Sequence, residues 1–284
     1  MDFERQIITS RQNQYVTLAA KLQDRKHRQS EKLFRFDGVK LYAEAVGRGV
    51  PLSFLLVDAS RIDALDAKAR ALCGIGIADA PCRVLYVCSE LFARISEENA
   101  PEGVIGVAAY LENVRAVAAP GGDDGMPAEL ASPCGGRLLL CESLRDPGNL
   151  GTVIRTAYAF GIDCLVLSRD CADVYNPKTL RGAMGTLFAQ RILIADDLAA
   201  TVSYLQEKGR SVYAAALDPT ARQLGSFTFG TGDCAVIGNE GHGLSQKVID
   251  ACRAKVYIPM AGDAESLNAS VAASVLMWEM CRAK

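Results

Sequence analysis

The sequence lacks any segment with the character of a secretory signal or a membrane-spanning helix. Its longest apolar runs have the length of a strand, and the N-terminal segment MDFERQIITSRQNQYV is polar. The ten cysteines are scattered without a C-x-x-C pair, which argues against a disulfide framework and favours buried, reduced thiols. These absences predict a soluble, cytoplasmic protein with no metal site.

Phosphate-binding signatures are also missing. The segment ESLRDPGNLGTVIRTAYAFGID (142–163) is a turn that leads into a helix, but it matches neither G-x-G-x-x-G nor the Gly-Lys-Ser/Thr end of a P-loop. Two later loops lack basic residues: no Lys or Arg occurs between Val236 and Gln246 or between Val256 and Cys281. These loops are therefore poorly suited to a ligand with several phosphates.

The charge that is present is unevenly distributed. The 284 residues carry a net charge of −2, but residues 1–40 hold nine Lys/Arg against five Asp/Glu, a local charge of +4, and the remainder carries −6. A basic N-terminal arm on an acidic body can contact a polyanion with one face. A solvated helix face explains the same charges, so charge alone does not decide between the two.

Glycine, proline and the apolar pattern divide the chain into four parts. Residues 1–28 are predicted to form a helical arm. Residues 29–117 are predicted to form a small α/β domain, with a helix at 39–49 and strands at 32–38, 52–59, 82–89 and 103–111. Residues 118–136 have no periodicity and many breakers, so they are the predicted linker, and residues 137–284 form a second α/β domain.

The second domain alternates more clearly between strands and helices. Continuous apolar strands are predicted at 137–143, 162–168, 191–195, 211–217, 234–238 and 254–260. Helices are predicted after the first turn, at 179–189 and 199–209, after Leu244, and from about Ser266, which is the predicted N-cap of the last helix. This order predicts a parallel sheet covered on both faces, with ligands at the carboxyl ends of its strands.

The loops at 238–244 and 259–266 suit a nucleoside that carries a cationic group. Gly238, Gly241 and Gly243 follow a strand and let the backbone approach a ligand, while Glu240 and two further carboxylates are acidic. S-adenosylmethionine is such a ligand, because its adenosine uses apolar walls and backbone amides and its sulfonium tolerates acidic neighbours. A tight connection between strand and helix explains the same glycines.

The turn at 143–149 leads into a helix that carries an arginine. Pro147 and Gly148 set the turn, and Asn149 can cap the helix. Arg155 follows Gly151 by one helical turn, and the missing side chain at Gly151 lets the guanidinium reach the turn. An arginine on a helix is also a common surface residue.

Three segments, NLGTVIRTA, VIGNEGHGLS and IPMAGDAESLNASVA, resemble in order the three motifs of the SpoU (TrmH) branch of the SPOUT RNA 2'-O-ribose methyltransferases. RFDGVKLYAEAV and PEGVIGVAAY resemble, less specifically, the substrate-binding domain of the ribosomal RNA members. The resemblance implies a C-terminal SPOUT domain with a parallel sheet and a trefoil knot, and a smaller N-terminal α/β domain of L30e-like type. It also implies a homodimer with the active site near the interface.

The resemblance further implies which residues act. It places S-adenosylmethionine against Leu217, Gly238, Ile258 and Leu267. It places the polar functional positions at Asn149, Arg155, Glu240, Ser266 and Asn268. His242 stands where the family varies and receives no role.

The implied reaction is methyl transfer to a ribose 2'-hydroxyl in structured RNA, with ribosomal RNA as the implied substrate. Arg155 is expected to position the nucleophile and stabilise developing alkoxide charge, or to act as the base. Asn149 would orient Arg155 or the ribose. The basic arm is expected to contact RNA phosphates through Lys26, Arg28, Lys32 and Arg35.

Other functions remain open at this point. A nicotinamide-dependent oxidoreductase requires G-x-G-x-x-G after an early strand, whereas VGRG at 46–49 follows a helix. A non-catalytic RNA-binding module has no need for the polar motif residues, which are present. In the last helix Leu267, Val271, Val275 and Trp278 recur at near-helical spacing, which fits a dimer interface or an intramolecular core.

Overall fold

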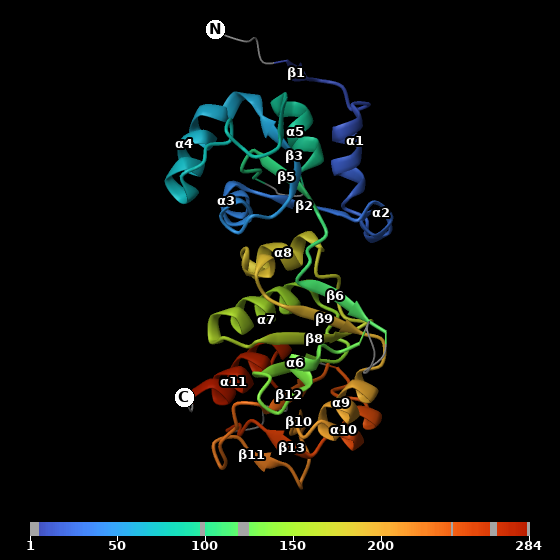
Figure 1. Ribbon diagram of the computed structural model, residues 1–284. Coiled ribbons are helices and arrows are strands. Elements are labelled where there is room, and N and C mark those ends of the chain that lie inside the picture. The colour runs from blue at the N-terminus through green and yellow to red at the C-terminus, as the bar shows by residue number, and fades with distance from the viewer. Residues whose placement is uncertain (1–5, 97–99, 119–124, 240, 262–265, 283–284) are drawn as a thin grey trace. The chain divides into compact units, whose positions relative to one another are not determined.

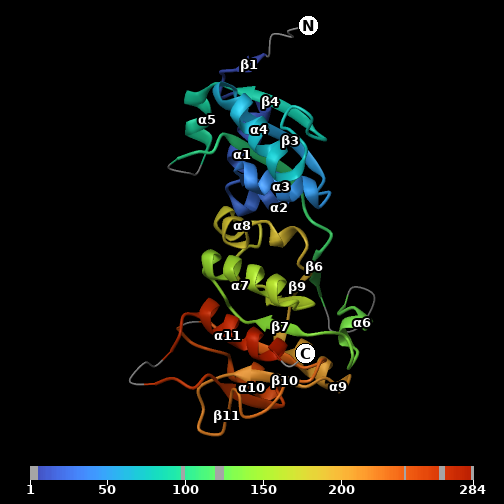
Figure 2. The same ribbon diagram turned by 90° about the vertical axis from the view of Figure 1, so that its left-hand side faces the viewer.

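The computed structural model describes residues 6–96, 100–118, 125–239, 241–261 and 266–282. The chain divides into two compact units, Met1–Leu111 with Tyr175–Phe188 and Glu112–Val174 with Ala189–Lys284 (Figure 1; turned by 90° in Figure 2). Each unit has its own sheet, and the chain crosses between the units three times. Throughout the described ranges, every helix is too short or too polar to cross a membrane.

The first unit is a mixed sheet with helices. Its strands are β1 (Ile7–Ile8), β2 (Leu33–Asp37), β3 (Leu52–Asp58), β4 (Arg83–Val87) and β5 (Val104–Ala109). Its helices are α1 (Gln14–Lys21), α2 (Arg25–Glu31), α3 (Val39–Gly47), η1 (Ala59–Arg61), α4 (Ile62–Cys73), α5 (Ser89–Ile95), α8 (Pro177–Ala183) and η2 (Thr186–Phe188). The sheet order is β1-β4-β3-β5-β2, and β5 runs antiparallel to both its neighbours.

The predicted helical arm at 1–28 is wrong in part, because this segment belongs to the first unit. Strand β1 pairs in parallel with Tyr86 and Val87 of β4. Helix α1 buries Val16 and Ala19, and Leu22 follows them into the same apolar cluster. Packing within the first unit thus explains the pattern of apolar and polar residues in α1.

The predicted single helix at 179–189 is also wrong, since Met184 and Gly185 have left-handed backbones with φ of 49° and 84° and separate α8 from η2. This segment packs on the first unit. Tyr175 stacks on Phe34 and on Tyr110, with ring centroids 4.8 and 4.1 Å apart. The Tyr175 hydroxyl accepts a hydrogen bond from the Leu111 N–H at 2.8 Å. Long-range aromatic packing, which sequence periodicity does not report, decides where this segment lies.

The second unit is the parallel sheet that the sequence predicts. Its strands are β6 (Val114–Val117), β7 (Leu138–Cys141), β8 (Cys164–Ser168), β9 (Ile192–Ala195), β10 (Val212–Ala215), β11 (Arg222–Gln223), β12 (Cys234–Ile237) and β13 (Ala254–Tyr257). Its helices are α6 (Ala128–Ala131), α7 (Pro147–Phe160), α9 (Leu198–Glu207), α10 (Gln246–Ala251) and α11 (Ala269–Arg282). The order is β11-β13-β10-β12-β7-β8-β9-β6, with every neighbouring pair parallel.

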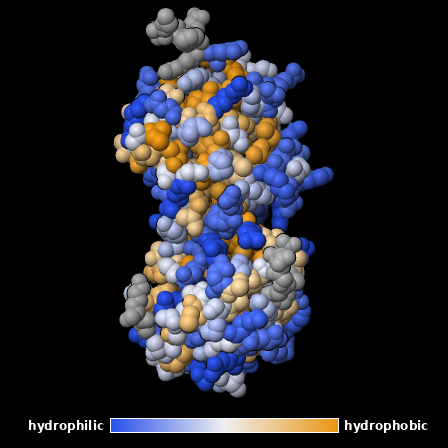
Figure 3. Space-filling view, viewed as in Figure 1, coloured by the Kyte–Doolittle hydropathy of each residue, from blue (hydrophilic) through white to orange (hydrophobic). Residues whose placement is uncertain are grey.

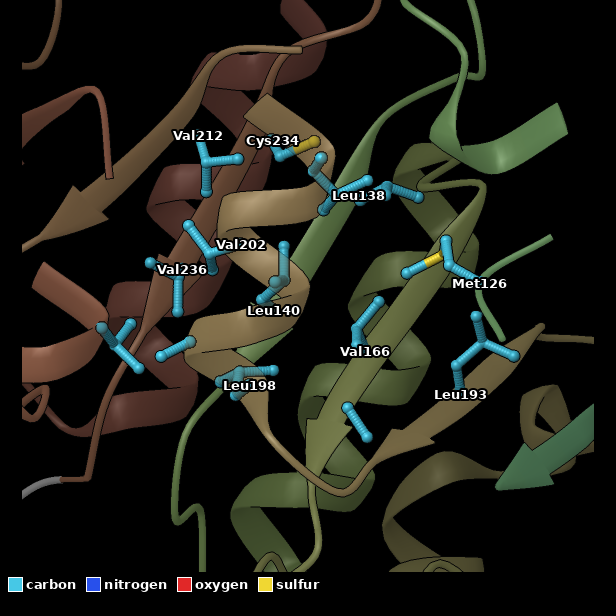
Figure 4. Close-up of a cluster of buried hydrophobic side chains, with 14 of the residues drawn as sticks. Met126, Leu138, Leu140, Val166, Leu193, Leu198, Val202, Val212, Cys234 and Val236 are labelled. Atoms are coloured by element: carbon cyan, nitrogen blue, oxygen red, sulfur yellow. The ribbon is translucent and has the colours of Figure 1, made fainter. Parts of the chain in front are cut away.

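Helices cover both faces of this sheet. Leu138, Leu140 and Val166 point to one face, where they pack with Leu198 and Val202 of α9 (Figure 4). The strands alternate their side chains, so residues such as Leu139 face the opposite side, where α7 and α11 pack together. On the surface drawn in Figure 3, the most hydrophobic residues gather on the first unit, and hydrophilic residues cover most of the second.

The segment 118–136, predicted to be a linker, differs from that prediction in its described part. Strand β6 before it pairs with β9 of the second sheet, and α6 buries Leu130 and Ala131 in the core of the second unit. Arg210 holds the segment by donating hydrogen bonds to the carbonyls of Leu130 and Gly136. The second unit therefore begins before the predicted linker, at Glu112.

Candidate functional site

A pocket of about 400 Å³ opens at one edge of the second sheet. It is lined by residues that end or follow three adjacent strands, β10, β12 and β13, and by the start of α11. The carboxyl ends of parallel strands meet at one edge, which is where open α/β sheets bind ligands. The four residues assigned to the cofactor by resemblance all line this pocket, namely Leu217, Gly238, Ile258 and Leu267.

The lining is mostly apolar. Leu244, Ile249, Val256 and Leu276 contribute to the walls, and Ser266 is the one lining residue among those predicted polar positions that the structure describes. No Lys or Arg lines the pocket within the residues that the structure describes. The absence of basic residues in these loops, noted in the sequence, therefore extends to the described walls of the cavity.

Gly238 is required by a close approach of two backbone segments. A Cβ atom at this position would lie 2.2 Å from both the carbonyl carbon and the oxygen of Gly243. Asn239 and Gly243 form a bridge in which each N–H donates to the other's carbonyl, at 3.1 and 2.8 Å. The glycine both tightens the strand-to-helix connection and forms part of the pocket wall, so the two interpretations of these glycines are compatible.

Hydrogen bonds fix this loop to the end of β7. The Asn239 side chain donates to the Ser143 carbonyl at 2.9 Å. The Glu142 carboxylate accepts from the backbone N–H and the hydroxyl of Ser245, both at 2.7 Å. Ser245 is the N-cap of α10, so Glu142 also orients that helix. No local pattern in the sequence indicates this role of Glu142, because Glu142 and Ser245 are 103 positions apart.

The turn before α7 is capped differently from the prediction. Asp146, not Asn149, is the N-cap, and its carboxylate accepts from the Asn149 N–H at 2.7 Å. This leaves the Asn149 side chain to act elsewhere: its Oδ1 accepts a hydrogen bond from Asn268 Nδ2 at 3.1 Å. The first and third motifs are thus joined side chain to side chain.

The N-cap of the last helix also differs from the prediction. Asn268, rather than Ser266, caps α11, because its Oδ1 accepts from the N–H and hydroxyl of Ser270 at 3.0 and 2.7 Å. Asn268 therefore uses its oxygen to start the helix and its amide nitrogen to hold Asn149. Leu267, one residue earlier, lines the pocket.

Arg155 lies on the exposed face of α7, outside the residues that line the pocket. Gly151, one turn earlier, is buried. The predicted reach of the guanidinium back to the turn is not seen: Arg155 forms no hydrogen bond or ion pair with any residue in the described ranges. Glu240, the remaining predicted polar residue, lies outside the residues that the structure describes.

Three apolar residues of α11, and Leu267 just before it, are exposed. The exposed fractions are 36% for Leu267, 48% for Val271, 37% for Val275 and 56% for Trp278. The Trp278 ring lies 5.7 Å from that of Phe160 on α7, measured between centroids. An intramolecular core does not explain this stripe, because its residues are open to solvent within this chain.

The cysteines near the first motif are not activated. Cys141 ends β7 and is fully buried, and burial raises the pKa of its thiol well above the usual value. Burial likewise raises the pKa of Cys171, which donates to the Cys141 carbonyl at 3.4 Å. A thiolate nucleophile at this position is therefore disfavoured.

The four basic residues predicted to contact RNA separate into two pairs. Lys26 and Lys32 are exposed, and the Lys32 ammonium lies 5.7 Å from the centre of the Tyr110 ring. Arg28 and Arg35 are buried, which contradicts their predicted role. Arg28 donates to the Leu22 carbonyl at 2.8 Å, and Arg35 forms a buried ion pair with Asp37 at 2.7 Å.

Residues 136–278 match the SpoU rRNA Methylase family, and residues 13–106 match the MRM3-like substrate binding domain. The chain is 31% identical over 280 residues to the 23S rRNA (guanosine(2553)-2'-O)-methyltransferase RlmP of Bacillus subtilis (strain 168), which covers 96% of this chain and 98% of that protein. It is also 31% identical over 281 residues to the 23S rRNA (uridine(2479)-2'-O)-methyltransferase of Streptomyces viridochromogenes, covering 97% and 91%.

Solved structures of methyltransferases are also similar to this chain over nearly its whole length. The SpoU methyltransferase AviRb from Streptomyces viridochromogenes in complex with AdoMet superimposes with a TM-score of 0.79 at 27% identity, covering 95% of this chain and 98% of that one. The AdoMet-bound rRNA methyltransferase from Sinorhizobium meliloti superimposes with a TM-score of 0.76 at 26% identity, covering 98% and 97%. With a methylase region that spans half of it and relatives that align along nearly all of it, the chain belongs to the SpoU rRNA methylase family.

Proposed function

We propose that this protein transfers the methyl group of S-adenosylmethionine to a ribose 2'-hydroxyl in ribosomal RNA. The observation that carries the proposal is the pocket, which brings together Leu217, Gly238, Ile258 and Leu267 from three separate loops. The relatives named above are 23S rRNA 2'-O-methyltransferases, and they align with this chain from end to end. This agreement favours the methyltransferase over an oxidoreductase or a non-catalytic RNA-binding module.

The residues present fit the methyl donor. A cavity of about 400 Å³ lies within the size range of small-molecule sites. Its apolar walls suit the adenine, and the strand ends at Gly238 and Ile258 offer backbone groups that can bind the polar edges of the ligand. When bound, the donor supplies a methyl group activated by the positive charge on its sulfur. No described lining residue opposes that charge with a permanent positive charge of its own.

The chain's task is then to align and deprotonate a weak nucleophile. We assign Arg155 to the ribose, where its planar guanidinium positions the 2'-oxygen and stabilises the alkoxide charge that develops on it. Its exposure and lack of described partners leave this group available to a polyanionic substrate. Because arginine stays protonated, the proton passes to a group other than Arg155, such as a neighbouring phosphate or water.

The asparagine pair connects this function to the pocket. The hydrogen bond from Asn268 to Asn149 fixes the start of α7, which carries Arg155, relative to the start of α11, which Leu267 precedes. We assign Asn149 to orienting the ribose or Arg155. Ser266 and Glu240 complete the polar part of the site, Ser266 from the pocket wall.

RNA binding is assigned to the first unit. The match to a substrate-binding domain covers residues 13–106, and Lys26 and Lys32 present exposed positive charge within it. These ammonium groups position RNA by contacting phosphates, without reading sequence. The segment 175–188 belongs to the same compact unit and completes it.

We further propose that the protein acts as a homodimer through the apolar stripe of α11. Val271, Val275 and Trp278 are exposed in the single chain, and a second copy would bury them. Arg155 lies on the neighbouring helix α7, which packs against α11. A dimer that buries this face would therefore place Arg155 near the interface.

Methyl transfer to total RNA, followed by a deoxy substitution, tests the proposal. Radiolabelled S-adenosylmethionine should label ribosomal RNA, and a labelled fragment should then be remade with one 2'-deoxy nucleotide at the modified position. We expect the deoxy fragment to bind with similar affinity and to accept no methyl group. Continued methylation of the deoxy fragment would show that the acceptor is a base.

A further inference from the structure

Ser143 lies in the turn between β7 and α7 and has a strained backbone. Its φ is 54°, in the left-handed region that side chains rarely adopt. Within the described residues, only Lys32 and Met184 share this feature among residues other than glycine. Such strain persists where surrounding contacts impose it, and it clusters at functional sites. The turn that contains Ser143 leads directly into the helix that carries Asn149 and Arg155.

Three groups of Ser143 are each held by a different partner. Its N–H donates to the Ser168 hydroxyl at 2.8 Å, and its own hydroxyl donates to the Asp170 carboxylate. Its carbonyl accepts from the Asn239 side chain at 2.9 Å. The Ser168 hydroxyl donates to the other oxygen of Asp170 at 2.6 Å. Asp170 therefore joins two hydroxyl groups, one from the turn and one from the end of β8.

The next residue of the turn is held by the same loop. The Leu144 N–H donates to the Cys171 sulfur at 3.3 Å, and the Ala172 N–H donates to the Leu144 carbonyl at 2.9 Å. Because β7 and β8 are parallel neighbours, the loops that follow them start at the same edge of the sheet. Residues 168–172 thus hold the turn before α7 from the side of β8.

Asp170 suits this task because its carboxyl stays ionised. Burial raises the pKa of this carboxyl, but the hydrogen bonds from Ser143, Ser168 and Arg145 lower it more, so the pKa lies below its usual value. An ionised carboxylate only accepts, and charge strengthens the hydrogen bonds that it receives. The Arg145 guanidinium lies 3.3 Å from Asp170 and is exposed, so this ion pair contributes little to holding the turn.

We infer that Asp170 and Ser143 form a positioning pair that holds the turn before α7 in the geometry needed for methyl transfer. This inference rests on the proposed function. Both residues lie outside the set that lines the pocket, so they act through α7, which carries Asn149 and Arg155. Release of the turn would let the start of α7 shift, and a misplacement of about 1 Å can reduce a rate by on the order of a hundredfold.

The loop that walls the pocket has supports that do not involve Asp170. Asn239 and Gly243 form their own backbone bridge, and Glu142 accepts two hydrogen bonds from Ser245. Loss of the Asp170 carboxylate should therefore lower turnover and leave the dissociation constant of S-adenosylmethionine within about twofold of the wild-type value. A general loss of folded structure would instead change both quantities.

Single-turnover methyl transfer to RNA and calorimetry with S-adenosylmethionine test the pair on the full-length protein. We expect Asp170→Ala and Ser143→Ala each to reduce turnover by roughly tenfold, and the double variant to lose little more than either, because both changes remove the same contact. Asp196→Ala is the matched control. It removes the carboxylate that pairs with Arg169 at 2.7 Å just after the neighbouring strand β9, and it should behave as wild type.

Ser143→Gly separates the hydroxyl from the backbone conformation. Glycine adopts the left-handed conformation without strain, so this variant should unfold at a higher denaturant concentration than Ser143→Ala. It still lacks the hydroxyl, so its turnover should be as low as that of Ser143→Ala. Wild-type turnover in Ser143→Gly or in Asp170→Ala would overturn the inference.

A second measurement does not depend on activity. In Asp170→Ala the amide protons of Ser143 and Leu144 should exchange with solvent faster, whereas those of β8 should keep their wild-type rates. Unchanged exchange at Ser143 and Leu144 would show that Asp170 does not hold the turn. Failure of the wild type to methylate RNA would instead remove the proposed function on which the inference rests.

Discussion

The proposed cofactor pocket and the exposed face of α7 and α11 lie in the same unit but are built in opposite ways. The pocket is walled by strand ends and apolar side chains that this chain supplies by itself. The helix face presents Arg155 and a stripe of apolar residues, including Trp278, to solvent. The described walls of the pocket come from one chain, whereas the helix face has the composition of a surface that is completed by contact.

From this contrast we expect the pocket to govern ligand binding and the helix face to govern catalysis. Changes in the pocket should act first on ligand affinity, whereas changes on the helix face should act on turnover with ligand affinity preserved. The hydrogen bond between Asn149 and Asn268 joins the start of α7 to the start of α11, next to Leu267 of the pocket wall.

The largest effect is expected from Gly238→Ala. The added Cβ would lie 2.2 Å from the backbone of Gly243, so the loop must move and the pocket wall with it. We expect S-adenosylmethionine binding to fall below detection by calorimetry. Gly241→Ala is the matched control, because its Cβ would meet its nearest atom, Asn239 Oδ1, at 3.4 Å. Normal binding by Gly238→Ala would show that this backbone contact is not needed for the pocket.

Arg155→Lys is expected to reduce turnover on the order of a hundredfold while the dissociation constant of the cofactor changes less than about twofold. The charge is kept, but the planar two-pronged geometry is lost. Single-turnover methyl transfer at saturating cofactor measures the effect. Arg191→Lys, at an exposed arginine paired with Glu129, serves as the control and should retain full activity. Unchanged turnover in Arg155→Lys would remove the catalytic assignment.

Val271→Glu should convert the proposed dimer into a monomer and reduce activity by about tenfold or more, because burying an unpaired carboxylate in an interface is unfavourable. Light scattering at micromolar concentration gives the oligomeric state, and the transfer assay gives the activity. Leu72→Glu, at a residue on α4 that is 50% exposed, is the control and should leave both unchanged. A wild-type protein that is monomeric and fully active at this concentration would contradict the dimer.

Asn268→Ser should reduce turnover by about tenfold and change stability by less than about 1 kcal/mol, because serine keeps the helix cap but removes the amide that donates to Asn149. Asn268→Ala removes both and should additionally destabilise the protein by about 1 kcal/mol. Denaturant unfolding separates the two effects. Combining Asn268→Ser with Asn149→Ala should cost little more than either alone, and fully additive losses would contradict a shared role.

The smallest effect is expected from the double substitution of Lys26 and Lys32 by Glu. RNA binding should weaken, and the slope of log affinity against log salt should fall in magnitude by about 2, because two fewer counterions are released. Filter binding over a range of salt concentrations measures this slope. Lys208→Glu in the second unit serves as the control. If the slope stays constant in the double variant, these lysines form only a solvated surface.

Much of the second unit could be predicted from the sequence, because the information is local. Apolar runs between helices give a parallel sheet, and the glycines and missing basic residues after β12 and β13 mark the ligand edge. The choice of cofactor residues came from resemblance of the motifs, and all four line the pocket.

Predictions that depended on contacts between residues far apart in the sequence were less accurate. Arg28 and Arg35 belong by charge to a basic arm, but Leu22 and Asp37 hold them inside the first unit. The same basic residue type is compatible with a solvated surface or a buried ion pair, and only the surrounding fold distinguishes the two. The composition of residues 1–40 therefore overstates the charge available to RNA.

The order of residue types is enough to predict a parallel α/β unit with a ligand edge, and its three motifs resemble those of RNA methyltransferases. The tertiary structure decided that residues 175–188 join the first unit, that Asp146 and Asn268 are the helix caps, and that the stripe on α11 is left open. The physical reason is that strand and turn formation follow the chemistry of neighbouring residues. Burial, exposure and the partners of polar side chains depend on segments that the fold brings together from far along the chain.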